Sequence, residues 1–290
     1  MTAANCGEKT LLALCSGING KLLQYNKVED KWQEYASINY GYKWYQTIIK
    51  DDNLLFIGGF KNRDTLNIVR SWNIRNKTWR DLPTMKQARK FHCVVELDGK
   101  IYAIGGYDGK NALSSVERYT TSNGWQFVNK LIVGRYAAAE VTLNGKIYII
   151  GGKSGRNGLK SVECYNPDSN TWTSCADMTE CHYYPGVAAH NSHIYLLGYF
   201  SGNRNVERYD PQQDTWSKIC SLKVGDGFKA CVSLDNKLWA IGGNSGSIFS
   251  GKNCVSVYDE ENDRWGQKCS LPESGIRSCF VVPEALLTSK

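Results

Sequence analysis

The decapeptide KIYAIGGYDG at residues 100–109 is an apolar, strand-like run that stops at two glycines, and near-copies of it recur along the chain. NLLFIGGFKN begins at residue 53, KIYIIGGKSG at residue 146 and KLWAIGGNSG at residue 237. Degraded copies at Gly198-Tyr199 and Cys15-Ser16 complete the series. Each copy is followed by a tryptophan, and the six tryptophans are spaced 47, 46, 47, 44 and 49 residues apart. The chain is therefore predicted to contain six copies of one unit.

Each unit divides into four short strands separated by turn residues. In the third copy the expected strands are HCVVEL at 92–97, KIYAIGG at 100–106, SSVERY at 114–119 and GWQFV at 124–128. No segment has a sustained 3.6-residue period with helix caps, so helix should be nearly absent. The aromatic residue that precedes each tryptophan, as Tyr119 precedes Trp125, is expected to pack with it between neighbouring units.

One four-stranded sheet of this size cannot bury both of its faces, whereas six sheets packed radially around an axis can. The first copy lacks an inner strand, and IRSCFVV at 276–282 has that pattern without a following partner. We therefore expect the C-terminal strand to complete the first sheet and close the ring. The predicted single domain spans 1–290, and its sheets take these boundaries: 10–36 with 276–283, 43–83, 89–129, 135–176, 182–220 and 226–270.

The combination of Gly-Gly, an SVERY- or SVECY-like strand and a tryptophan six or seven residues after the tyrosine resembles the kelch repeat. IYAIGGYDGKNALSSVERY is especially similar to repeats of kelch-like proteins, and the resemblance covers residues 9–283. It implies an all-β, six-bladed kelch β-propeller with four antiparallel strands per blade. Departures at Cys15-Ser16, Trp72 and Tyr199 put the local loop geometry in doubt but not the fold.

Kelch-like proteins usually carry BTB and BACK domains, which dimerise and recruit a cullin-3 ubiquitin ligase, ahead of the propeller. Neither domain is present in these 290 residues. The chain is either the substrate-recognition fragment of such an adaptor or a stand-alone kelch protein. Because it begins so close to its first strand, the fragment is the expectation favoured here.

Composition narrows the class of partner. The net charge of +7 comes from scattered residues without Lys/Arg runs, which argues against nucleic acid and favours an acidic protein. Eleven cysteines without a CxxC pair indicate a reducing, cytoplasmic setting. No apolar run approaches the length that spans a membrane, and the apolar part of KTLLALC at 9–15 is too short for a signal peptide. We expect neither a membrane nor a nucleic-acid partner.

Motifs for catalysis are absent from the sequence: there is no P-loop, HExxH, GxSxG or metal-ligand spacing. Cys181 and His182 are adjacent, but neighbouring strand residues point to opposite faces and do not form a nucleophile–base pair. Kelch-type copper oxidases need two tyrosines and two histidines at the metal, and no such set can be placed. The sequence therefore predicts no enzyme, no metal and no cofactor.

The resemblance also implies a binding face. In kelch-like adaptors the partner docks on the loops before the inner strand and after the Gly-Gly, and many of these proteins place an arginine sixteen residues before the first glycine. The corresponding positions here, with the C-terminal strand as the sixth, are Tyr42, Arg89, Arg135, His182, Asp226 and Arg277. The alternative is that each arginine only bonds loop carbonyls.

Aromatic residues are unusually frequent in the same loops, where small polar residues are the norm. Aromatic and arginine enrichment is typical of binding hot spots, although about half of these rings are expected to pack beneath their loops. The candidates are Tyr42, Trp44, Phe91, Tyr136, Tyr183 and Phe228 before or in the inner strands, and Phe60, Tyr107, Lys153 and Phe200 after the glycines.

These observations predict a non-catalytic protein-interaction module, the substrate-recognition domain of a cullin-RING ubiquitin ligase adaptor. Its ligand would be a short peptide segment, for which an acidic composition is expected. Arg89, Arg135 and Arg277 would pair with its carboxylates or phosphates, so charge reversal of Arg89 and Arg135 should abolish capture without unfolding the chain. The alternatives are an actin-binding cytoskeletal module and a copper enzyme.

Overall fold

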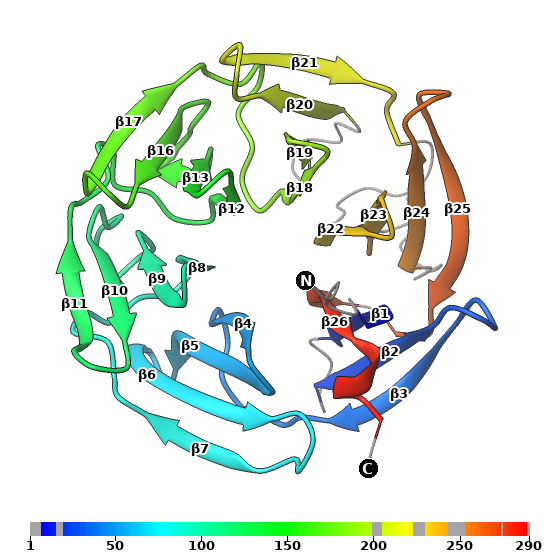
Figure 1. Ribbon diagram of the computed structural model, residues 1–290. Coiled ribbons are helices and arrows are strands. Elements are labelled where there is room, and N and C mark those ends of the chain that lie inside the picture. The colour runs from blue at the N-terminus through cyan, green and yellow to red at the C-terminus, as the bar shows by residue number, and fades with distance from the viewer. Residues whose placement is uncertain are drawn as a thin grey trace, which may run out of the picture.

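The computed structural model of the chain describes residues 7–15, 20–198, 205–222, 230–242, 253–273 and 275–288. These residues form six four-stranded antiparallel sheets arranged around a central axis, as Figure 1 shows. In the described part of the chain the one helical element is the short 3₁₀ helix η1 (Glu284–Leu286). The predicted all-β, six-bladed propeller is confirmed. No helix among these residues has the length and apolar character needed to cross a membrane.

The blades follow one another along the chain; blades 2 to 6 each begin with their innermost strand, whereas blade 1 takes its innermost strand from the C-terminal end. Blade 1 contains β26 (Ile276–Pro283), β1 (Lys9–Cys15), β2 (Lys21–Asn26) and β3 (Lys31–Ser37). Blade 2 contains β4 (Gln46–Lys50), β5 (Asn53–Lys61), β6 (Asp64–Asn73) and β7 (Trp79–Leu82). Blade 3 contains β8 (Cys93–Leu97), β9 (Lys100–Ile104), β10 (Val116–Thr120) and β11 (Gly124–Val128).

The second half of the ring repeats this order. Blade 4 contains β12 (Ala139–Leu143), β13 (Lys146–Ile150), β16 (Val162–Asn166) and β17 (Thr171–Cys175), with the small hairpin β14 (Lys153–Ser154) and β15 (Asn157–Gly158). Blade 5 contains β18 (Gly186–His190), β19 (His193–Leu197), β20 (Val206–Asp210) and β21 (Thr215–Ile219). Blade 6 contains β22 (Ala230–Leu234), β23 (Lys237–Ile241), β24 (Asn253–Asp259) and β25 (Arg264–Leu271).

The two ends of the chain share blade 1. β26 pairs antiparallel with β1, from Lys9 opposite Pro283 to Cys15 opposite Ile276, and Figure 1 shows the red β26 beside the blue β1. Ile276 and Val282 are buried in two different apolar clusters of the core. The predicted closure by the C-terminal strand is therefore confirmed.

The Gly-Gly pairs lie in close contact with neighbouring backbone, including that of the next blade. A Cβ on Gly105 would lie 2.6 Å from the carbonyl oxygen of Arg135 in blade 4, and one on Gly106 would lie 2.7 Å from His92 Cβ. Both glycines also have positive φ, 59° and 101°. The Gly106 N–H donates to the Arg135 carbonyl at 2.8 Å, which joins blade 3 to blade 4. Glycine is thus required both for backbone conformation and for contact between blades.

The Tyr…Trp pairs join the blades on their outer side. Tyr119 lies opposite Trp125 across β10 and β11, with ring centroids 5.3 Å apart. The Trp125 indole N–H donates to the carbonyl of Pro83 in blade 2 at 3.0 Å. Equivalent bonds run from Trp172 to Asn129, from Trp216 to Ala176 and from Trp265 to Cys220. The predicted packing role of these pairs is confirmed, and a hydrogen bond between blades accompanies it.

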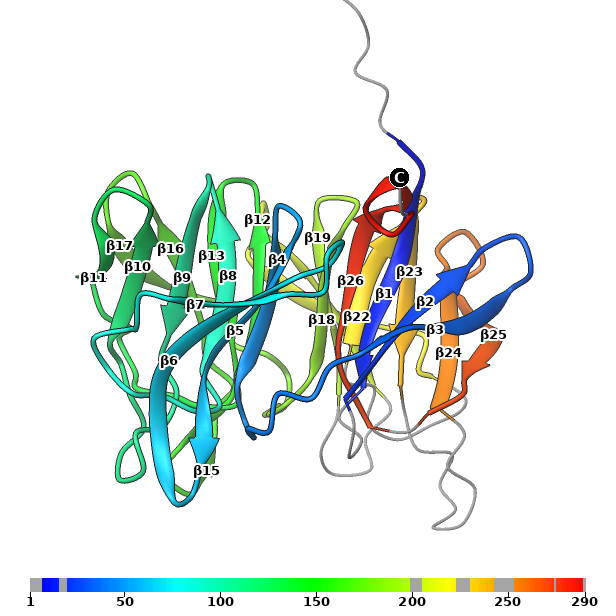
Figure 2. The same cartoon turned by 90° about the horizontal axis from the view of Figure 1, so that it is seen from below.

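One face of the ring carries the loops that follow the Gly-Gly pairs. On it the β5–β6 hairpin extends past Gly59, and β14–β15 forms a second projection. Figure 2 shows the ends of β5, β6 and β15 on the side opposite the C-terminus. We call this side the loop face.

Candidate functional site

Two of the predicted site arginines lie inside the blades. The Arg89 side chain is fully buried, and its Nη2 lies 2.8 Å from Oε1 of the equally buried Glu117. Its Nη1 donates to the carbonyls of Gly105 and Ser115 at 2.7 and 3.1 Å. Arg135 repeats this arrangement one blade later, with Glu163 at 2.5 Å. Each arginine therefore ties its own inner loop to the second and third strands of its blade.

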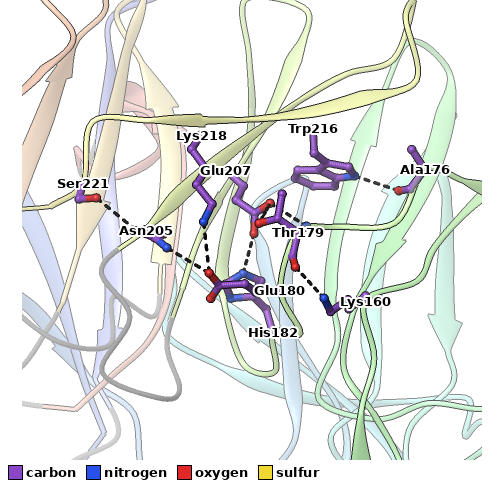
Figure 3. Close-up of polar contacts among 10 residues, drawn as sticks. All are labelled: Lys160, Ala176, Thr179, Glu180, His182, Asn205, Glu207, Trp216, Lys218 and Ser221. Atoms are coloured by element: carbon purple, nitrogen blue, oxygen red, sulfur yellow. Dashed lines mark hydrogen bonds and ion pairs between the residues drawn. The ribbon is translucent and has the colours of Figure 1, made fainter.

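In blade 5 a histidine replaces the arginine of this buried pair with glutamate, as Figure 3 shows. His182 Nε2 lies 2.9 Å from Glu207 Oε1, and both residues are buried. The other carboxylate oxygen of Glu207 accepts bonds from the Thr179 N–H and hydroxyl at 3.1 and 2.9 Å. Burial alone would raise the pKa of Glu207, but the hydrogen bonds from His182 and Thr179 hold it below its ordinary value.

These three buried pairs with glutamate change the role expected of the arginine or histidine in each of them. A guanidinium or imidazole with almost no exposed surface and a buried carboxylate partner cannot meet a carboxylate of another protein. The structure therefore moves Arg89, Arg135 and His182 from the binding surface to the framework beneath it. Charge reversal at Arg89 or Arg135 would bury two carboxylates together, so the structure leads us to expect loss of stability, in place of the intact fold expected from the sequence.

The remaining arginine, Arg277 on β26, has a different setting. It is partly exposed, its guanidinium lies 4.3 Å from the centroid of the Tyr45 ring, and Nη1 is 3.5 Å from the Tyr45 carbonyl. None of the carboxylates that the structure describes forms an ion pair with it. Tyr42 is half-buried and packs on Tyr40 at 4.5 Å. Three other predicted site residues, Phe200, Asp226 and Phe228, lie outside the described residues.

A cavity of about 560 Å³ follows the axis. Residues of the innermost strands β4, β12, β18, β22 and β26 line it, among them Arg277, Ser278 and Glu140. Burial raises the pKa of Glu140 to about 8, although hydrogen bonds from the Cys93 thiol and the Val94 backbone partly oppose this. The Glu140 carboxyl is therefore mostly protonated at neutral pH, and Arg277 provides a positive charge in the same cavity.

This raised pKa makes stability depend on pH. The folded state holds the Glu140 proton more tightly than the unfolded chain, so stability present below pH 4.5 is lost as the pH rises toward 8. We expect the wild type to lose up to about 1.4 kcal/mol per pH unit relative to Glu140→Gln in that window. Urea unfolding of both proteins across the window measures this. Glu29→Gln, in an exposed turn, is the control and should follow the wild type; parallel curves for Glu140→Gln and wild type would contradict the assignment.

Aromatic residues surround the opening of the cavity in a strained backbone conformation. Trp44, Phe91, Ala137 and Tyr184 occupy the same place in blades 2 to 5, and all have positive φ, between 53° and 57°. Backbone hydrogen bonds link them in order. The Phe91 N–H donates to the Trp44 carbonyl at 3.2 Å, the Ala137 N–H to the Phe91 carbonyl at 2.8 Å, and the Tyr184 N–H to the Ala137 carbonyl at 2.9 Å. Non-glycine residues in this region are uncommon and cluster at functional sites.

We call Trp44, Phe91 and Tyr184 the aromatic collar. Phe91 lies 4.8 Å from Trp44 and 5.8 Å from Tyr184 between ring centroids, and Ala137 has no ring to separate them. Trp44 and Tyr184 are 37 % and 40 % exposed, among the most exposed large apolar side chains of the described residues. The sequence places all three rings in aromatic loops, Tyr184 within HYY at 182–184, but only Trp44 and Phe91 were among the candidate site residues. The position of Tyr184 two residues after His182, matching Phe91 after Arg89, was the available signal.

A second row of side chains lies outside the collar and contains two lysines, each flanked by aromatic rings. Lys90 Nζ lies 4.1 Å from the Phe60 centroid and 5.7 Å from that of Tyr107. Tyr107 and Tyr136 are 5.3 Å apart, and Lys153 Nζ lies 4.8 Å from the Tyr183 ring. We call this row the aromatic–lysine arc: Phe60, Lys90, Tyr107, Tyr136, Lys153 and Tyr183. Lys90 was missed because its neighbour Arg89 matched the expected pattern.

The chemistry on the loop face suits binding. Exposed rings provide apolar contact, and lysines provide positive charge. Among the described residues there is no group of three or more His, Cys, Asp or Glu side chains arranged to hold a metal ion.

Known proteins share the repeat and the fold. A family model described as the kelch motif matches residues 50–86, 88–131, 134–179 and 181–222, which is more than half of the chain. Kelch-like protein 28 of Homo sapiens is 32 % identical over 127 residues, 39 % of this chain and 22 % of that protein. A putative F-box/kelch-repeat protein of Arabidopsis thaliana is 38 % identical over 77 residues, 26 % of each chain.

Kelch repeat and BTB domain-containing protein 2 of cowpox virus is 38 % identical over 77 residues, 26 % of this chain and 14 % of that protein. The matches thus span about a quarter or less of these relatives' length. The solved structure of YjhT is similar with a TM-score of 0.74 at 16 % identity, covering 92 % of this chain and 96 % of that one, a likeness of fold. The four matched repeats, set in a six-bladed propeller, show that this chain belongs to the kelch-motif family.

Proposed function

We propose that this propeller is a non-catalytic substrate-recognition domain of a cullin-RING ubiquitin ligase adaptor. It would hold a short acidic peptide segment of its target on the loop face, and the ligase would be recruited through BTB and BACK domains outside these 290 residues. The names of three relatives, kelch-like, F-box/kelch-repeat and kelch repeat and BTB domain-containing, support this proposal.

The aromatic collar is the observation that carries it. Exposed rings lose favourable apolar burial, and one left-handed residue in each of four neighbouring blades costs conformational energy. A fold that maintains both at the opening of its cavity gains from them when a partner covers the rings. Aromatic side chains of this kind dominate the energy of protein interfaces. A cytoplasmic location follows for the same proposal, since all ten cysteines that the structure describes are free thiols.

The collar variant Trp44→Ala/Tyr184→Ala tests the proposal. We expect affinity capture from cell extract, followed by mass spectrometry, to lose the bound target, with affinity for that target reduced at least about tenfold. Phe127→Ala is the matched control, because Phe127 is 53 % exposed on the outer strand β11. An unchanged set of captured proteins would rule out the collar as the docking site. Co-sedimentation of the wild type with actin filaments would favour the cytoskeletal alternative instead.

A further inference from the structure

We infer that Lys90 and Lys153 of the aromatic–lysine arc are the cations that bind the carboxylates of an extended acidic peptide. This inference rests on the proposed function and deepens it. It assigns the binding of the ligand's negatively charged groups to two lysines on the loop face, in place of the buried Arg89 and Arg135.

Lys90 has an unusual environment for a lysine. Its Nζ lies 4.1 Å from the Phe60 centroid, 5.1 Å from Trp44 and 5.7 Å from Tyr107, and the residue is 9 % exposed. No carboxylate that the structure describes is within ion-pair distance, and burial lowers the pKa of Lys90 without a compensating anion. Cation–π contacts replace only part of the lost hydration. A ligand carboxylate that binds this ammonium would supply the ion pair and hydrogen bonds that it lacks.

Lys153 holds the equivalent place in blade 4 with the two positions exchanged. In blade 3 the lysine precedes the inner strand and Tyr107 follows the glycines, whereas in blade 4 Tyr136 precedes and Lys153 follows. Each pair faces across an isolated β-bridge. The arc therefore presents two ring-supported ammonium groups, joined by the Tyr107–Tyr136 contact at 5.3 Å. An extended peptide crossing blades 3 and 4 would pass both.

The charge around the arc supports an acidic ligand. Lys61 lies over the Tyr42 ring at 4.5 Å and stands opposite Asp64 in the β5–β6 hairpin, without an ion pair to any carboxylate that the structure describes. The nearby carboxylate of Asp108 is occupied in its own turn, where it accepts the N–H groups of Lys110 and Asn111 at 2.7 Å each. Asp108 keeps its negative charge there, but Lys61, Lys90 and Lys153 form no ion pair with a carboxylate that the structure describes, and these three cations outnumber Asp64 and Asp108, which favours anionic partners.

The same contacts argue for a peptide and against single-stranded nucleic acid. Bases bind such surfaces by stacking on free ring faces. Here Lys90 covers Phe60, and Lys153 covers Tyr183. These two ring faces are therefore closed to a stacking base, whereas a carboxylate is small enough to approach a lysine that is 9 % exposed, such as Lys90.

The test uses the full 290-residue chain and a random dodecapeptide display library. We expect peptides selected by the wild type to be enriched in Asp and Glu, and this enrichment to disappear on Lys90→Met/Lys153→Met. Methionine keeps the length and the ring contacts of lysine while removing the charge. Selected peptides, made synthetically, should bind the variant at least about tenfold more weakly by fluorescence polarisation, as expected for loss of charge-assisted bonds. Lys146→Met, at the opposite end of blade 4, is the matched control and should bind like the wild type.

The possible outcomes separate this inference from the proposed function. Selected peptides without acidic enrichment would overturn the inference and leave peptide recognition standing. If acidic peptides bind Lys90→Met/Lys153→Met normally but fail to bind Arg277→Met, then Arg277 in the cavity binds the acidic groups. That result would also overturn the inference. Tighter binding of an oligothymidine strand than of any peptide would do the same. Failure of the wild type to select any peptide would contradict the proposed function itself.

Discussion

Deleting residues 276–290 is expected to abolish cooperative folding of the whole propeller. The deletion removes β26, which pairs with β1 over seven residue positions and buries Ile276 and Val282. Without it β1 becomes an open inner edge, and the apolar surfaces of blades 6 and 2 that face blade 1 lose their cover. Because domains are stable by only about 5–15 kcal/mol, losing a strand that closes the ring exceeds the available margin.

Circular dichroism and thermal melting measure this effect. The truncated chain should show no sharp transition, whereas Ile276→Ala should keep one transition and lose about 2–5 kcal/mol, as for other buried large-to-small changes. A chain ending at residue 288 is the length control and should melt like the wild type. A truncated chain with an unchanged melting temperature would show that the ring does not depend on this closure.

The second large effect is expected at the buried Arg135–Glu163 pair. Arg135→Met should reduce the free energy of unfolding by about 3–5 kcal/mol, because it leaves the Glu163 carboxylate buried without its cation. Glu163 would keep only the backbone N–H groups of Ile132 and Val133 as partners. The double variant Arg135→Met/Glu163→Met should recover part of the loss, since it removes the unpaired charge.

Urea unfolding provides the measurement, with Arg70→Met as the matched control. Arg70 and Asp81 are as close, at 2.7 Å, but their side chains are 32 % and 81 % exposed. Solvent screens such a pair, so its loss should cost at most about 1 kcal/mol. Equal losses for Arg70→Met and Arg135→Met would contradict a framework role for Arg135.

The fold could be predicted because its determinants are local and repeated. Gly105 is required by positive φ and by contact with the next blade, and Gly106 by positive φ and by contact with His92 of its own blade, so such glycines recur in sequence at the period of the blades. The Tyr119–Trp125 pair recurs for a similar reason, since every blade presents the same outer surface to its neighbour. The closing strand could be recognised because residues 276–282 have the pattern of an inner strand but are not followed by the second strand of a blade.

The site could be predicted only in part. The sequence located the loop face and several of its rings, but it could not show that Arg89 and Arg135 turn inward. The glutamates that hold them, Glu117 and Glu163, each stand 28 residues further on. This constant spacing was a usable signal, yet it does not by itself distinguish a buried pair from two exposed charges.

The amino-acid sequence by itself determined the number of blades, the strands within them and the closure of the ring, because backbone conformation and repeated packing act through residue type and spacing. The tertiary structure alone decided which charges face a partner. Arg89 and Lys90 are neighbours in the chain, but one is neutralised by Glu117 inside the blade and the other lies among rings on the loop face. That difference depends on residues brought together from separate strands and blades, and no local pattern contains it.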